Sequence, residues 1–368
     1  MPVDLTKWTF PPFSGTRNGG YVYGRGAIDD KSHVVAALMV VLTLKRLGLP
    51  LDRDVIFLAE AGEENTTSIG MEFMVEQHLP EIAAQYCFAE GGYVRRIGGQ
   101  VKFASVETLE KIQKTVELTA RGAAGHGSIP LPTNAVVHLA RAIAALAAWH
   151  PPIRLNETTS TYFERLAGIV SPEEAARYRS LRGSDPAAAA AAARYMVDHE
   201  PIHASMLWPS VSPTMVTGGY RVNVIPSEAK ATLDVRLLPD DDAGEVLAAL
   251  RKVVDDPAIE VVYGKRDSVP VASADLETEA FSAIEAAVTK HYQTVTLPTM
   301  STATTDMPYI RSRGTQCYGI GPALDWEDAA KGFGPHSDQE RILETELHRF
   351  IRFEWDIVAG LSKTRASP

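Results

Sequence analysis

Acidic and histidine side chains gather in four short loops of this sequence. The loops are GRGAIDDK at 24–31, AEAGEEN at 59–65, FAEGG at 88–92 and GPHSD at 334–338. A hydrolytic metal centre takes ligands from separate loops and also needs a carboxylate that stays off the metal to handle the proton of the attacking water. The adjacent Glu63 and Glu64 can divide these two tasks. Together the four loops predict a hydrolytic metal centre.

Each loop taken alone also has a structural explanation. Two aspartates before a helix, as in GRGAIDDK, often cap its N-terminus, and two glutamates after a strand often form a solvated turn. The GRGAIDDK loop lacks the glycine spacings of the phosphate-binding motifs, so a nucleotide site is not predicted there. Four such loops in one chain favour metal binding over four unrelated turns.

The size and charge of the chain argue against several other classes of protein. At 368 residues it exceeds the usual size of one hydrophobic core, which predicts two domains, one inserted in the other. A net charge of −10 argues against a nucleic-acid partner, and no apolar run approaches the roughly 18 residues of a membrane span. Cys87 and Cys317 each lie in an apolar run and are interpreted as core residues rather than as a disulfide or a metal site.

Apolar patterning places the acidic loops between helices and strands. A helix is predicted over 31–48, ended by Gly48, then a strand over 54–60, a helix over about 69–78 and a strand over 86–90. This alternation indicates parallel strands covered by helices. Catalytic groups in such folds lie at the carboxyl ends of the strands, where the acidic loops fall.

The middle of the chain follows a strand, helix, strand, strand, helix, strand order. The predicted elements are, in that order, 114–121, 133–149, 213–222, 229–238, 243–253 and 259–263. This is the split βαβ pattern of a ferredoxin-like module. A helical insertion interrupts it, and the alanine run at 187–193 is interpreted as a surface helix rather than as low-complexity sequence, because alanine is the strongest helix former.

Helices and strands alternate again in the last quarter of the chain. The predicted elements are a helix at 278–292, a strand at 315–320 and a long final helix from Glu340. The simplest architecture is one α/β catalytic domain made from residues 1–112 and 264–368, with residues 113–263 inserted as a second domain.

Eight sequence strings match, in order, a known family of metallopeptidases. They are WTFPPFSG, YVYGRGAIDDK, AEAGEEN followed by SIG, FAEGG, GAAGHGSIP, NVIPSEAKATLDVR, TTDM and GPHSD. From about Trp8 onward the chain resembles the aminoacylase, carboxypeptidase S and acetylornithine deacetylase superfamily of di-zinc metallopeptidases. The resemblance implies a mixed α/β sheet covered by helices and an inserted ferredoxin-like lid domain that forms a homodimer. It also implies zinc-dependent hydrolysis of amide bonds in N-acyl amino acids or small peptides.

The resemblance implies roles for the acidic loops. Asp29 would bridge two zinc ions, Glu64 and His336 would complete one zinc site, and Glu90 would belong to the other. Glu63 would be the general base that activates the metal-bound water and later protonates the leaving amine. Two zinc ions per subunit are implied for the complete enzyme, with Co²⁺ or Mn²⁺ as substitutes.

Three further residues are implied to act on the substrate. His126 in GHGS is similar to a family histidine that crosses a dimer interface to stabilise the oxyanion, although a loop histidine bonded within its own turn is the structural alternative. Asn223 is implied to donate to the substrate. Arg236 has the shape to bind a substrate carboxylate through two hydrogen bonds but can equally pair with Asp234.

The sequence also departs from the family at one motif. Members carry HxDVVP, whose histidine binds the second zinc, at the point where this chain opens with MPVDLTKW. We therefore expect an N-terminally shortened member whose second zinc site keeps only Asp29 and Glu90. A catalytically impaired fragment that serves as a binding or dimerisation protein is the alternative function.

We expect a cytoplasmic location by default, and a secretory signal further upstream stays open. The resemblance also implies that Thr305 and Asp306 lie near the active site and support the metal ligands without taking part in the chemistry.

Overall fold

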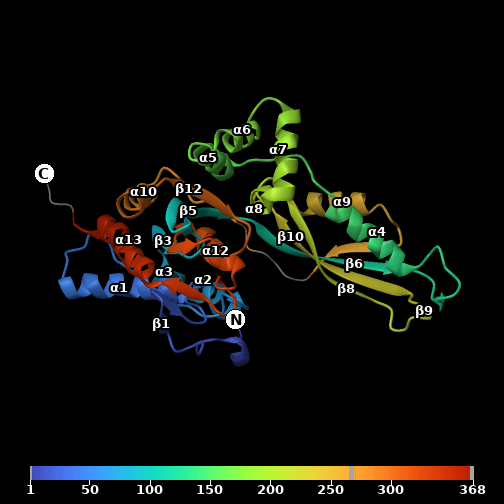
Figure 1. Ribbon diagram of the computed structural model, residues 1–368, viewed down its shortest axis with the longest axis horizontal. Coiled ribbons are helices and arrows are strands. Elements are labelled where there is room, and N and C mark those ends of the chain that lie inside the picture. The colour runs from blue at the N-terminus through green and yellow to red at the C-terminus, as the bar shows by residue number, and fades with distance from the viewer. Residues whose placement is uncertain (1, 265–268, 270, 365–368) are drawn as a thin grey trace.

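The protein is elongated, with a mixed sheet at one end and an antiparallel sheet at the other (Figure 1). The computed structural model describes residues 2–264, 269 and 271–364. Each sheet has its own buried apolar cluster, and a third cluster joins the mixed sheet to a group of inserted helices. The division of the chain into a catalytic and an inserted domain stays a prediction.

The mixed sheet contains six strands. Its strands are, in spatial order, β14 (Ala323–Asp325), β4 (Tyr93–Ile97), β5 (Gln100–Glu110), β13 (Gln316–Gly319) and β3 (Tyr86–Ala89), with β12 (Thr296–Ser301) pairing with β5 off this path. The pairs β13/β3, β12/β5 and β14/β4 are parallel, whereas β4 and β5 form an antiparallel hairpin. The expected mixed α/β fold class is confirmed.

Helices cover both faces of the mixed sheet. On one face lie α1 (Lys31–Leu47), α10 (Glu279–Tyr292) and α13 (Glu344–Ser362). On the other lie α2 (Met71–Gln77), α3 (Leu79–Ile82) and α11 (Met307–Arg311). Residues 103–110 of β5 are all buried, as expected for a strand covered on both sides. Cys87 and Cys317 are neighbours on β3 and β13 and are free thiols, as predicted.

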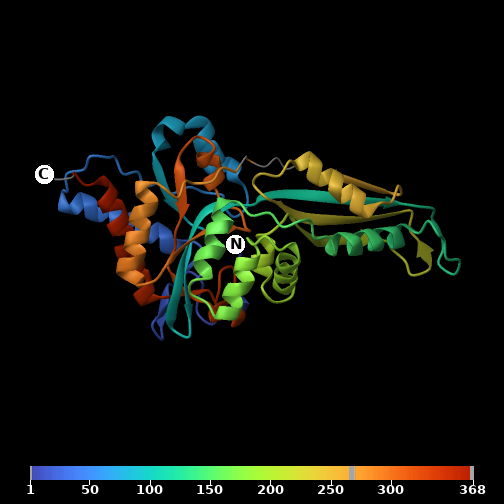
Figure 2. The same ribbon diagram turned by 90° about the horizontal axis from the view of Figure 1, so that it is seen from above.

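The antiparallel sheet has the predicted ferredoxin-like arrangement. Its strands are, in spatial order, β11 (Ile259–Tyr263), β6 (Ile112–Arg121), β10 (Glu228–Leu237) and β8 (Ser210–Gly218). Helices α4 (Ala135–Ala147) and α9 (Ala243–Val254) pack side by side on one face of it (Figure 2). Only Lys111 separates β5 from β6, so one nearly continuous length of strand joins the two sheets.

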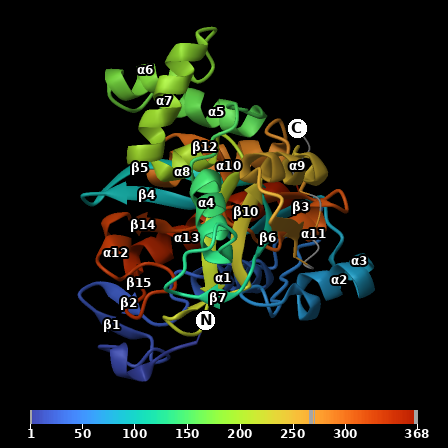
Figure 3. The same ribbon diagram turned by 90° about the vertical axis from the view of Figure 1, so that its right-hand side faces the viewer.

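Four helices interrupt the ferredoxin-like module. They are α5 (Glu157–Leu166), α6 (Pro172–Ser180), α7 (Pro186–His199) and α8 (Pro201–Ser205). The alanine run is helical as predicted, because α7 begins with Pro186 after Asp185, whose side chain caps its first N–H groups. The insertion packs on the mixed sheet, sharing a core with Phe103 and Leu109 of β5 and Leu297 of β12. Figure 3 shows α5 to α7 rising above these two strands.

The strand predicted over 54–60 is wrong. These residues are neither strand nor helix. An extended segment becomes a strand only when a neighbour exchanges backbone hydrogen bonds with it. Here a cavity of about 830 Å³ is lined by Val55 and Phe57 as well as by Tyr86 and Phe88 of β3, the edge strand of the sheet. The sequence pattern identified an apolar segment correctly, but it does not specify a neighbouring strand with which that segment could form hydrogen bonds.

The predicted start of the last helix is also wrong. Helix α13 begins at Glu344, because residues 341–343 form β15 (Arg341–Leu343). This strand pairs with β2 (Tyr21–Tyr23), which in turn pairs with β1 (Thr16–Asn18). Glu340 is fully buried instead of opening a surface helix. The described residues contain no helix that is long and apolar enough to span a membrane.

Candidate metal centre

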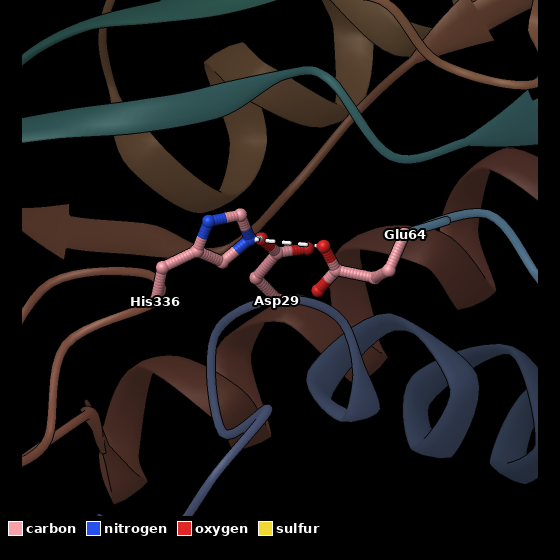
Figure 4. Close-up of side chains that lie close together, drawn as sticks. All are labelled: Asp29, Glu64 and His336. Atoms are coloured by element: carbon pink, nitrogen blue, oxygen red, sulfur yellow. Dashed lines mark ion pairs between the residues drawn. The ribbon is translucent and has the colours of Figure 1, made fainter. Parts of the chain in front are cut away.

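Three of the predicted metal ligands, Asp29, Glu64 and His336, lie together (Figure 4). One ligand atom from each falls within 4.8 Å of the other two. His336 Nε2 is 2.8 Å from Asp29 Oδ2 and 3.2 Å from Glu64 Oε2. Within the described ranges no second group of three such side chains is found. Residues from three distant loops thus meet as the sequence pattern anticipates.

Asp29 lies in the loop that leads into α1. The next residue, Asp30, is the N-cap of that helix, and the peptide bond between the two aspartates is cis. The backbone N–H groups of Gly26, Ile28 and Asp29 donate to the carboxylate of Glu340 at 2.8, 2.7 and 3.0 Å. Glu340 therefore fixes the backbone that carries Asp29.

The buried charge of Glu340 is balanced by Arg25. Nη1 of Arg25 donates to Glu340 Oε2 at 3.0 Å, and Nη2 donates to the backbone carbonyl of His336 at 3.4 Å. His336 itself has a φ of 62°, a backbone conformation that is uncommon outside glycine. One buried ion pair thus supports both the Asp29 loop and the His336 loop. Sequence reasoning missed Glu340, although it follows GPHSD by only one residue.

A glycine shapes the loop that carries Glu63 and Glu64. Gly62 has a φ of 91°, and a Cβ at this position would lie 2.2 Å from the carbonyl oxygen of Thr66. The N–H groups of Asn65 and Thr66 donate to Gly62 O at 3.0 and 2.7 Å. Any larger residue would open this turn and move both glutamates.

Glu63 and Glu90 contact each other beside the three ligands. A hydrogen bond joins their side chains, and Glu90 directly follows β3, at the carboxyl end of that strand. Burial, followed by the charge of Asp306, raises the pKa of Glu63 to about 7. Burial, followed by the charge of Glu63, raises the pKa of Glu90 to about 9. Glu90 lies outside the group of three, and its place in a second zinc site stays a prediction.

The donor set suits a divalent cation of the zinc type. Carboxylate oxygens and an imidazole nitrogen are ligand types that zinc accepts, and three protein ligands are the number found in catalytic zinc sites, which keep a fourth position for water or substrate. Burial, followed by the charge of Glu64, raises the pKa of Asp29. A cation between these carboxylates would favour their charged forms. It would also require a deprotonated nitrogen on His336, because only a free ring nitrogen coordinates metal.

Further acidic side chains lie close to Glu63. Glu60 forms a side-chain hydrogen bond with Asp306, and burial raises the pKa of Glu60 to about 8. Thr305 donates to Glu110 from its N–H at 3.1 Å and from Oγ1 at 2.7 Å. Asp306 therefore lies near Glu63, and the supporting role implied for Thr305 and Asp306 stays a prediction. Sequence reasoning missed Glu60 and Glu110, because neither differs by type or spacing from an ordinary surface glutamate.

His126 and Asn223 lie together, far from the three ligands of the same chain. His126 belongs to β7 (Gly125–His126), which pairs with β9 (Val224–Ile225) directly after Asn223. β9 lies at the end of the antiparallel sheet that points away from the mixed sheet (Figure 1). His126 Nδ1 accepts from the N–H of Ser128 at 3.2 Å, which places the proton of a neutral imidazole on Nε2.

Arg236 lies on β10 and pairs with its near neighbour. Its Nε and Nη2 donate to the two carboxylate oxygens of Asp234 at 2.8 and 3.0 Å. The ion pair with Asp234, the alternative to substrate binding for Arg236, is therefore present. Its buried Nη1 has no hydrogen-bond partner among the described residues, so this atom keeps a donor for a further acceptor. A role in substrate binding stays a prediction.

Comparison with known proteins identifies the family. The sequence pattern of "Peptidase family M20/M25/M40" matches residues 1–357. The chain belongs to this family. The M20 chain is 27% identical over 376 residues to "Probable carboxypeptidase S-like 2" of Dictyostelium discoideum, a match that covers 98% of this chain and 69% of the relative. It is 24% identical to human "N-fatty-acyl-amino acid synthase/hydrolase PM20D1", over 97% of this chain and 71% of that protein.

Solved structures of the family share the fold of this M20 chain. The metallo-carboxypeptidase Sso-CP2 of Sulfolobus solfataricus gives a TM-score of 0.70 at 20% identity, covering 97% of this chain and 82% of its own. Human carnosine dipeptidase 1 gives a TM-score of 0.64 at 17% identity, covering 98% and 78%. Family membership confirms the predicted resemblance and makes the chain a hydrolase of peptide or related amide bonds.

We expect zinc to bind at Asp29, Glu64 and His336. The His336→Ala variant should lower zinc affinity by more than about 100-fold, beyond the roughly 10–100-fold that follows loss of an outer partner. Zinc content after dialysis against a graded series of chelators measures this. His78→Ala is the matched control, because His78 pairs with Glu81 on the surface. Equal zinc affinity in both variants would contradict the assignment.

Proposed function

We propose that this chain hydrolyses the amide bond of N-acyl amino acids or small peptides with a free carboxylate, with Glu63 as the general base. The observation that carries the proposal is the position of Glu63, a half-buried carboxyl directly before Glu64 of the metal group but outside that group. A carboxylate that lies beside a metal site without binding the ion can take a proton from the attacking water and return it to the leaving group. The name of the human relative, an N-fatty-acyl-amino acid synthase/hydrolase, supports the substrate class.

Asp29, Glu64 and His336 would hold the catalytic zinc. A zinc ion there supplies Lewis acidity toward the substrate carbonyl and lowers the pKa of water. We propose a second zinc held by Asp29 and Glu90, as the resemblance implies. Glu63 takes a proton from the attacking water and later gives it to the leaving amine.

In this proposal Arg236 binds the substrate carboxylate, whereas Asn223, which lies beside His126, would donate to the substrate bound by a second copy of the chain. The Nη1 donor of Arg236 supports it, because the other two donating nitrogens are already held by Asp234. A guanidinium fixed in this way loses little side-chain entropy on binding an anion. The preorganised arginine would select substrates that carry a free carboxylate.

We propose that His126 completes the site of a second copy of the chain. Within one chain it lies at the far end of the antiparallel sheet, so a stabilising contact with the oxyanion requires a partner. The edge strand β8 supports dimerisation, because in the described part of the chain it pairs with β10 alone, which leaves its outer edge open next to exposed Met215 and Val216. Two β8 strands placed edge to edge would join the two sheets.

The dimer proposal predicts that a charge on β8 separates the subunits. Val216→Lys should give a monomer at concentrations where the unchanged chain is a dimer, because like charges would meet across the two-fold axis. Light scattering coupled to size exclusion measures the mass. Ile169→Lys is the control, because Ile169 is also an exposed apolar residue but lies on the insertion. A monomeric wild type, or a Val216→Lys dimer, would refute the interface.

The function itself is tested by a hydrolysis screen of the zinc-supplemented chain. N-acyl amino acids and dipeptides should be cleaved, whereas analogues with an amide in place of the free carboxylate should not. Arg236→Gln should raise KM for the acids while kcat stays close to that of the unchanged chain. If no amide is cleaved while zinc binds normally, the alternative of a catalytically impaired binding or dimerisation protein replaces the proposal.

A further inference from the structure

A cavity of about 1030 Å³ lies between the inserted helices and the segment that leads into them. One wall is a face of α7 with Ala189, Ala190 and Val197, and the other includes Ile153 and Trp208. None of its lining residues belongs to the metal centre or to the small cavity beside Glu63. Ligand sites of proteins commonly have volumes of about 300–1000 Å³ and mostly apolar walls. The size and lining of this cavity match such a site.

The charged residues that line the cavity are all cationic. Arg182 and Arg194 contribute guanidinium groups, and the described lining contains no aspartate or glutamate. Arg182 is paired with Glu164 on the surface at 2.6 Å, where such pairs are weak. Arg194 has no carboxylate partner among the described residues.

We propose that this cavity binds an anionic amphiphile, a carboxylate on a long acyl chain. The apolar wall accommodates the chain, and the exposed Arg194 donates hydrogen bonds to the carboxylate in the paired geometry that guanidinium groups favour. A free fatty acid and an N-acyl amino acid share this chemistry. The site is separate from the metal centre, so it would sense a product or substrate of the proposed reaction without cleaving it.

A short chain of contacts connects the wall of the cavity to Asp306, whose charge acts on Glu63. The backbone carbonyl of Trp208 accepts a hydrogen bond from Lys111 Nζ at 2.9 Å. Lys111 directly follows Glu110, which holds Thr305 next to Asp306. Lys111 is fully buried between the two sheets. A ligand that shifts Trp208 therefore acts on the junction from which the antiparallel sheet extends.

Calorimetric titration of the full chain tests the proposal. The probes are dodecanoate, N-dodecanoylglycine and dodecylamine, all below their micellar concentrations. We expect one saturable site per chain for the two carboxylates and at least tenfold weaker binding of the amine. Tighter binding of dodecanoate would indicate a free fatty acid as the ligand, and tighter binding of N-dodecanoylglycine would indicate an N-acyl amino acid. The affinities should persist after zinc is removed with a chelator, which separates this site from the proposed catalytic one.

Three variants decide where binding occurs. Arg194→Gln should weaken the carboxylates about tenfold and leave the amine unchanged. Ala190→Trp should abolish binding by filling the cavity, whereas Ala191→Trp, the same change at an exposed residue of α7 that does not line it, should not. Circular dichroism establishes that each variant is folded. Equal binding of amine and carboxylate, or equal effects of the two tryptophan variants, would overturn the proposal.

Discussion

Replacing Glu63 by glutamine should lower kcat by about 10²–10⁴-fold, the range typical of a lost general acid–base group. The amide keeps the size of the side chain and one hydrogen-bonding oxygen but can no longer accept the proton of the attacking water. Zinc content and KM should change little, because Glu63 lies outside the group of three ligands. Stopped-time assays of amine release, with zinc measured on the same samples, check both expectations.

The control for this prediction is Glu81→Gln. Glu81 is an exposed glutamate that pairs with His78 on the surface, so its loss should leave kcat unchanged. A Glu63→Gln variant that retains activity within about threefold of the unchanged chain would assign proton transfer to another residue. Loss of zinc together with loss of activity would instead place Glu63 among the ligands, and the two glutamates of the pair would exchange roles.

Replacing Glu340 by alanine should lower the free energy of unfolding by about 3–5 kcal/mol, as expected when one partner of a buried ion pair is removed. The change leaves the guanidinium of Arg25 buried without its carboxylate and removes the acceptor from three backbone N–H groups. Denaturant titration of the zinc-free protein measures this loss.

The same variant should weaken zinc binding by about 10–100-fold, because Glu340 fixes the backbone of Asp29. Glu344→Ala is the matched control, since Glu344 pairs with Arg17 on the surface, where ion pairs contribute about 0–1 kcal/mol. If Glu340→Ala lowers stability but leaves zinc affinity unchanged, Glu340 supports the fold alone and does not position the Asp29 loop.

The sequence was most informative where residue type and chemistry coincide. Asp29, Glu64 and His336 were picked out by their loops, and they meet in space. The ferredoxin-like order and the alanine helix were predictable because hydrophobic period and helix propensity act locally. The strands β5 and β12 were missed, since a strand buried on both faces lacks the alternation that marks a half-exposed one.

Other errors came from long-range contacts. Residues 54–60 have the composition of a strand, yet strand formation depends on a neighbour that local sequence does not specify. Glu340 looked like the start of a helix because its three backbone donors lie more than 300 residues away along the chain. Such a residue gains its role only when distant loops meet, so its own type and flanking residues carry no signal.

Because only Lys111 separates β5 from β6, a small rotation at this residue would move the far end of the antiparallel sheet over a much larger distance. The ten residues of β6 extend roughly 33 Å at about 3.3 Å per residue. A rotation of about 10° at Lys111 would therefore carry the far end of that strand through roughly 6 Å. His126 and Asn223 lie beyond that end, on β7 and beside β9. Small rearrangements around one buried lysine thus become displacements large enough to bring a side chain into or out of hydrogen-bonding range.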